Sequence, residues 1–132
     1  MIEDFLKHPS NIARSASEYL TQLSGSEKTK RTHEDILFLF VQSLCGDSTA
    51  VVELDNGEFV LKYNWEDYYG GAVSSFIDWW IPRKVMSSAT LQSDAPGVMR
   101  MWIKWCYKED YFDKEHYDEY ISAVPTNKRK EV

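Results

Sequence analysis

Long apolar runs are absent from this 132-residue chain, and no stretch approaches the roughly 18 consecutive apolar residues of a membrane-spanning helix. The first ten residues, MIEDFLKHPS, also lack the basic segment and following apolar segment of a secretory signal peptide. We therefore expect a soluble, cytoplasmic protein that has no membrane among its partners.

Cysteine and histidine are scarce, with two and three residues respectively. His8, His33 and His116 stand far apart, so the short paired spacings of a zinc site are missing, and we expect no metal and no other cofactor. Cys45 and Cys106 each lie among apolar neighbours in expected helices. This setting favours buried free thiols over a disulfide.

Motifs of covalent and phosphate chemistry are also missing. The chain has no GxSxG sequence and no paired cysteine and histidine pattern. Its glycine pair at 70–71 falls in an expected helix, whereas a phosphate loop needs glycines after a strand. The adjacent acids at 66–67 and 118–119 are typical of helix starts and solvated faces. We expect a binding protein and not an enzyme.

The chain is rich in large apolar side chains, with 43% hydrophobic residues and 6 Phe, 8 Tyr and 5 Trp. This composition and length predict one folded domain over residues 1–124, followed by a flexible basic tail at 125–132. The net charge of -6 argues against a general polyanion binder. Every charged residue between 49 and 81 except Lys62 is acidic, so any anion-binding face must lie elsewhere.

The first part of the chain shows helical spacing of apolar residues twice. Ser10 is expected to cap a first helix over SNIARSASEYL, which ends before the breakers at 24–26. Thr32, with Asp35 three residues later, predicts the start of a second helix over HEDILFLFVQSL. The expected buried residues are Ile12, Ala16, Tyr19, Leu20 and Leu23 in the first helix and Ile36, Leu37, Phe40, Val41 and Leu44 in the second.

Residues 49–63 predict a β-hairpin, because β-branched and aromatic runs flank the Asp-Asn-Gly turn at 55–57. A two-stranded hairpin is only marginally stable alone, so one face is expected to lie on the helices. The expected contacts are Val52, Leu54, Phe59 and Leu61.

A third helix is expected from Asn64 through WEDYYGGAVSSFIDWWI, and Pro82 should end or bend it. Trp79 falls at the edge of the apolar arc and is expected to be half exposed. The arc itself holds Trp65, Tyr69, Ala72, Val73, Phe76, Ile77 and Trp80.

Two more helices complete a mainly α fold of about five helices, with the hairpin inserted between helices 2 and 3. After a polar connection over 86–93, Asp94 and Pro96 predict the start of a helix over GVMRMWIKWCYKED. Asp113 is expected to cap the last helix, KEHYDEYISAV. The expected apolar faces hold Val98, Trp102, Trp105 and Cys106 in the fourth helix and Tyr117, Tyr120, Ile121 and Val124 in the fifth.

Basic residues outside the acidic middle are the candidate nucleic-acid contacts, because Lys and Arg clusters can neutralise phosphates. They are Lys28, Lys30 and Arg31 before the second helix, Arg83 and Lys84 after Pro82, and Arg100, Lys104 and Lys108 on one exposed helix face. Solvated helix faces commonly carry such cations without any ligand, so both interpretations stay open. Trp79 is a candidate for stacking on a base.

Three stretches together give the chain a resemblance to a known family. ASEYLTQLSGSEKTKRTHEDILFLFVQSL, WEDYYGGAVSSFIDWWI and APGVMRMWIKWCYKEDYF resemble the helices of the N-terminal core-binding (SAM-like) domain of phage integrases and other tyrosine recombinases. The hairpin is an insertion relative to that family. The resemblance implies half of a clamp on duplex DNA, with mainly phosphate contacts. It would assign those contacts to Lys28, Lys30, Arg31, Arg100 and Lys104.

Two functional hypotheses therefore follow. One is a DNA-binding accessory domain that uses the basic residues. The other is a protein-interaction module or small homodimer, in which the acidic hairpin and Trp79 with neighbouring Tyr68 make the contact, since aromatic side chains are enriched at interfaces.

Overall fold

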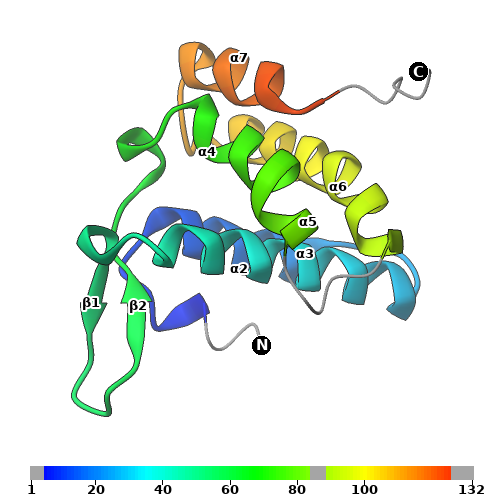
Figure 1. Ribbon diagram of the computed structural model, residues 1–132. Helices are drawn as coiled ribbons and strands as arrows, with labels where there is room; N and C mark the ends of the chain where they lie inside the picture. Colours follow the sequence, from blue (N-terminus) through cyan, green and yellow to red (C-terminus); the bar gives the residue numbers. More distant parts are fainter. Residues whose placement is uncertain (1–4, 84–88, 126–132) are drawn as a thin grey trace. The chain divides into compact units, whose positions relative to one another are not determined.

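The computed structural model describes residues 5–83 and 89–125 and has the expected mainly helical fold (Figure 1). One two-stranded hairpin lies between the second and third helices, as predicted. The chain divides into two compact units, Met1–Asp67 and Tyr68–Val132. The single domain expected over 1–124 stays a prediction. None of the helices within the described residues is long and apolar enough to cross a membrane.

In the first unit, helix α2 spans Asn11–Gln22 and packs on helix α3, Glu27–Cys45. The Ser10 hydroxyl accepts the backbone N–H groups of Ile12 and Ala13, which confirms the expected cap. The expected apolar residues are buried in both helices, except Leu23, which follows α2 and is half-buried.

The expected start of the second helix at Thr32 is wrong, because α3 begins at Glu27. Ser26 is its cap and accepts the N–H of Thr29, while Gly25 turns the chain with a φ of 130°. The Thr32 hydroxyl instead donates to the Lys28 carbonyl inside the helix. A good capping residue six positions earlier, Ser26, thus sets the boundary.

The hairpin consists of β1, Val51–Glu53, and β2, Phe59–Leu61, which pair antiparallel with Val52 opposite Val60. Gly57 in the connecting turn has a φ of 87°, in agreement with the expected turn chemistry. The base of the hairpin is buried, and β2 packs on α3.

Two of the four expected hairpin contacts are wrong. Leu61 is buried and Leu54 is half-buried, but Val52 is 41% exposed and Phe59 is 61% exposed. Phe59 lies beyond the buried base of the hairpin, toward the turn. Val52 is level with buried Val60 but belongs to β1, whereas β2 is the strand that packs on α3.

The segment after β2 is tied to the start of α2 by reciprocal hydrogen bonds. The Asn11 N–H donates to Asn64 Oδ1 over 2.8 Å, and the Trp65 N–H donates to Asn11 Oδ1 over 2.8 Å. The Trp65 indole is buried, where its Nε1 donates to Ser15 Oγ over 3.2 Å and its ring stacks on Phe40. These contacts close the first unit around one core.

The continuous helix expected from Asn64 to Ile81 is wrong. A 3₁₀ turn, Trp65–Asp67, comes first, Tyr69 is extended, and helix α4 begins only at Gly70 and spans Gly70–Ser75. Tyr69 is consequently 71% exposed instead of buried.

In the second unit, α4 packs on helix α7, Lys114–Ala123, and the contact requires a glycine. A Cβ on Gly70 would lie 2.9 Å from the Glu119 carbonyl oxygen. The Gly70 N–H also donates to Glu119 Oε2 over 2.8 Å, and the Tyr120 hydroxyl donates to the Tyr68 carbonyl over 3.0 Å. Asp113 caps α7 through the N–H of His116, as expected.

Pro82 was expected to end or bend the helix; an end there is wrong, because helical residues continue through Arg83, and the bend stays a prediction. A π-helical turn, Phe76–Trp80, leads into the short helix α5, Ile81–Arg83, and the Ile81 N–H donates to the Phe76 carbonyl. In a regular α-helix the proline ring would meet the carbonyl four residues earlier, so we attribute the wider turn to Pro82. Trp80, expected in the core, is half-buried and packs on Phe76 with ring centroids 5.8 Å apart.

Helix α6 spans Ala89–Lys108, so the expected connection over 86–93 is wrong from residue 89 onward, and 86–88 lie outside the described residues. Asp94 is not a cap, and Pro96 lies inside the helix. Ala89, Leu91 and Gln92 are good helix formers, which lets the helix begin before the proline. Its buried face holds Ala95, Val98, Met99, Trp102, Ile103 and Cys106.

Several C-terminal expectations are met only in part. Tyr120 and Val124 are buried, while Trp105, Tyr117 and Ile121 are half-buried. Both cysteines are free thiols, as expected, and burial raises the pKa of Cys45. The tail from 126 onward lies outside the described residues.

The contact between α4 and α7 predicts opposite effects for two neighbouring glycines. Gly70→Ala should lower the free energy of unfolding by about 1–3 kcal/mol, because the new methyl group overlaps the Glu119 carbonyl. Gly71→Ala is the matched control: no atom lies within 4 Å of its Cβ position, so the variant should be neutral or more stable by up to about 1 kcal/mol. Urea unfolding followed by circular dichroism measures both, and equal effects would contradict the packing argument.

Candidate functional site

The outer edge of β2 is covered by the chain's own N-terminal segment. The Leu61 N–H points away from β1 and donates to His8 Nδ1 over 2.7 Å. Next to it, Lys7 Nζ lies 3.1 Å from Glu58 Oε1. Since Nδ1 accepts a hydrogen bond, the ring is neutral in this arrangement and its proton is on Nε2. Residues 7–8 therefore occupy one side of the two-stranded sheet.

Over residues 5–83 and 89–125, no segment of the chain pairs with the outer edge of β1. The Lys62 N–H donates to the Ala50 carbonyl, and the Leu54 N–H donates to the Glu58 carbonyl. Hydrogen-bonded pairs alternate along an antiparallel ladder, so the N–H and C=O groups of Val52 point toward Val60 on β2. The N–H and C=O groups of Val51 and Glu53 must then point outward. Within the residues that the structure describes, no protein group bonds to these four backbone groups.

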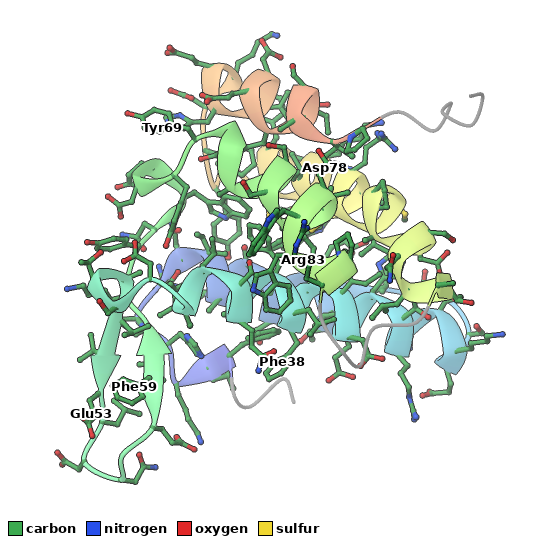
Figure 2. All side chains as sticks on the ribbon, in the orientation of Figure 1. Phe38, Glu53, Phe59, Tyr69, Asp78 and Arg83 are labelled. Atoms are coloured by element: carbon green, nitrogen blue, oxygen red, sulfur yellow. The ribbon has the colours of Figure 1, made fainter. Side chains whose placement is uncertain are left out.

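Apolar side chains are exposed on the same hairpin. Phe59 lies directly across from Glu53 in the strand register, on one face of the sheet, while Val52 lies opposite Val60 on the other face. Figure 2 shows Glu53 and Phe59 on the part of the hairpin nearer the turn. An exposed phenylalanine next to free backbone groups forms a surface suited to another polypeptide.

The hairpin carries negative charge at both ends. A hydrogen bond from the Thr49 backbone lowers the pKa of Asp47, and a hydrogen bond from the Lys7 ammonium lowers the pKa of Glu58. Glu53 and Asp55 are exposed between them. We call β1, β2, their turn and Asp47 the acidic hairpin.

The structure places the predicted basic residues on three separate elements. Lys28, Lys30 and Arg31 lie within the first turns of α3, not before the helix as expected. Lys104 and Lys108 are exposed on α6, and Arg100 is half-buried there, with Nη2 donating to the Pro125 carbonyl over 2.9 Å.

The predicted contact residues around Trp79 differ in accessibility. Trp79 is 56% exposed, as expected, and Arg83 Cζ lies 4.7 Å from the centre of its ring. Arg83 also donates to the Trp79 carbonyl over 3.0 Å, so its guanidinium group is held against the tryptophan. Tyr68 is half-buried, whereas its neighbour Tyr69 is the exposed aromatic residue. Lys84 lies outside the described residues.

Sequence reasoning missed the roles of His8 and of the β1 edge. The turn at 55–57 indicated the pairing of the strands, but nothing local in the sequence connects His8 with Leu61, which is 53 residues away. Over residues 5–83 and 89–125, no group of three or more His, Cys, Asp or Glu side chains is arranged to hold a metal ion.

A scan against protein-family models, a search of curated proteins and a search of solved structures each give no match to this chain. The resemblance to recombinase core-binding domains therefore stays an expectation, and functional inference rests on the residues themselves.

The contact between Lys7 and Glu58 predicts a pH effect. In Lys7→Gln, the pKa of Glu58 should rise toward its ordinary value, because the ammonium group that favours the carboxylate is gone. In the unchanged protein, the contact stabilises the fold above the ordinary carboxyl pKa and is lost as the pH falls through the lowered pKa of Glu58. NMR titration of the side-chain carboxyl measures the shift. Asp113, whose pKa the His116 N–H lowers, is the control and should not change.

Proposed function

We propose that this chain is a non-enzymatic protein-interaction module and that the acidic hairpin is its contact element. The observation that carries the proposal is the 61% exposure of Phe59 on a strand that His8 and Lys7 hold in place. A large apolar side chain on a fixed element loses little conformational entropy on binding, so more of its burial energy goes into affinity.

Stability of the chain itself does not explain this exposure. An aromatic side chain that stays in water contributes little to the free energy of folding, whereas aromatic anchors at the centre of interfaces contribute much of the binding energy. Val52 on the opposite face and the uncovered β1 edge extend the same surface. The hairpin thus presents apolar, polar and charged groups within a few residues.

The proposal predicts that Phe59→Ser weakens partner binding at least tenfold and leaves folding intact, because the side chain is mostly exposed. The partner would first be identified by photo-crosslinking from a benzophenone amino acid at position 59, and its affinity would then be measured with purified proteins by calorimetry.

Tyr69→Ser is the matched control, since it removes another exposed aromatic ring from a different element and should leave the affinity unchanged. Equal affinities of the Phe59→Ser variant and the unchanged protein would refute the hairpin as the contact element. Crosslinks only between copies of this chain would identify the partner as a second copy.

Duplex DNA binding is the second candidate function, and the position of three cations favours it. Lys28, Lys30 and Arg31 lie near the N-terminus of α3, where the helix dipole disfavours positive charge. Helix stability therefore does not explain the presence of these three cations, whereas contact with DNA phosphates would explain it. Arg83 and Arg100 each donate a hydrogen bond to a backbone carbonyl of the chain. These bonds argue against a wider DNA-binding surface that includes both arginines.

For DNA binding, fluorescence anisotropy of a labelled duplex across a salt series is the measurement. The double variant Lys28→Gln/Arg31→Gln should reduce the slope of log affinity against log salt by about 1.8, at about 0.9 per phosphate contact. The charge-matched control Lys62→Gln/Lys114→Gln should keep the slope. No binding at low salt, or an unchanged slope in the first variant, rules this candidate out.

A further inference from the structure

We propose that the open edge of β1 takes an extended, basic segment of a partner protein as a third, antiparallel strand. The inference rests on the proposed interaction function and specifies how the hairpin binds and what it binds.

The backbone geometry favours strand addition on the β1 side, because an outward N–H of β2 is already bonded to His8. Val51 and Glu53 offer two N–H donors and two C=O acceptors, which a neighbouring strand can pair. On the other side, His8 takes the Leu61 N–H and the Lys7–Glu58 pair lies alongside. Figure 1 shows the N-terminal segment beside β2 and not beside β1.

The β1 edge lacks three of the usual protections against pairing. Natural edge strands carry lysine, proline or a bulge that discourages a further strand. Val51–Glu53 has none of the three, and its charged residue is Glu53. The strand is short, so four backbone hydrogen bonds are the most that it can offer, and side chains must supply the rest of the affinity.

Charge selects the partner. Glu53 lies on β1, Asp55 follows in the turn, and Asp47 comes four residues before the strand; all three are exposed. A second copy of the chain would bring the same acidic set to the junction, in a protein whose net charge is already -6. A lysine or arginine opposite Glu53 makes an attractive cross-strand pair instead.

The two faces of the hairpin set the spacing in the partner. Side chains alternate between faces, so a basic residue on the face of Glu53 and Phe59 is followed by a residue on the face of Val52 and Val60. Val52 is 41% exposed there, which an apolar side chain would cover. The partner segment therefore alternates basic and apolar residues. The antiparallel sense follows from the stronger pairing that it gives per residue.

The test uses the full chain and an acetylated, amidated heptapeptide of alternating lysine and valine as the probe, with amide hydrogen exchange measured by NMR. In the free protein, the Val51 and Glu53 amides should exchange rapidly and the Val52 amide slowly, because only Val52 faces β2. Bound peptide should slow exchange at Val51 and Glu53 at least tenfold. Binding without that protection overturns the proposal.

Two N-methylated peptides separate strand pairing from charge. In the antiparallel arrangement the lysine N–H groups face β1, so N-methylation at every lysine should abolish binding, while N-methylation at every valine should preserve it. Both peptides have the same charge, and their numbers of added methyl groups differ by only one. Equal affinities would mean that charge alone acts, and an acidic peptide that binds equally well would exclude the role of charge.

Variants of Glu53 test the edge from the protein's side. Glu53→Gln removes the charge, and Glu53→Pro also removes an outward N–H without removing a ladder hydrogen bond. The peptide should bind about threefold or more weaker to the first and not measurably to the second. Glu66→Gln, an equal charge change at another exposed position of this unit, should leave binding unchanged.

The outcomes distinguish this inference from the proposed function. If a natural partner depends on Phe59 but binds the Glu53→Pro variant normally, the interaction function stands and strand addition fails. If protection of Val51 and Glu53 rises with protein concentration in the absence of peptide, a second copy takes the edge and the basic partner is wrong.

Discussion

The reciprocal hydrogen bonds between Asn11 and the Asn64–Trp65 segment are the constraint from which the first unit follows. They join the start of α2 to the chain that leaves the hairpin, over more than 50 residues of sequence. Trp65 can then be buried against Phe40, with its indole nitrogen bonded to Ser15. Because Asn11 is held there, His8 lies three residues away beside β2, and its ring accepts the Leu61 N–H.

That arrangement makes the two edges of a small sheet unequal. A two-stranded hairpin is marginal in water, and this one is supported at its base by α3 and along β2 by residues 7–8. The support leaves β1 and the Phe59 side chain facing outward. The exposed β1 edge and the exposed Phe59 therefore result from the contacts that support the hairpin on its other side.

The choice between the protein-interaction and DNA-binding hypotheses depends on which charged side chains already have contacts within the chain. Arg83 stacks on Trp79 and Arg100 bonds to the Pro125 carbonyl, so two of the predicted phosphate ligands have roles within the second unit. Glu53 and Asp55 in the hairpin, by contrast, are exposed, and a basic polypeptide would neutralise their charge and pair with the β1 edge. These contacts favour the protein-interaction hypothesis over the DNA-binding one.

The sequence by itself determined the elements whose signals are local: the caps at Ser10 and Asp113, the buried face of α3 and the turn around Gly57. Side-chain caps, apolar periodicity and positive-φ turns act within a few residues, so they can be recognised from the sequence. Tertiary structure alone decided the break before Gly70, where α7 approaches too closely for a side chain, and the pairing of His8 with Leu61. Those outcomes depend on atoms about 50 residues apart, and no local pattern encodes which distant groups will meet.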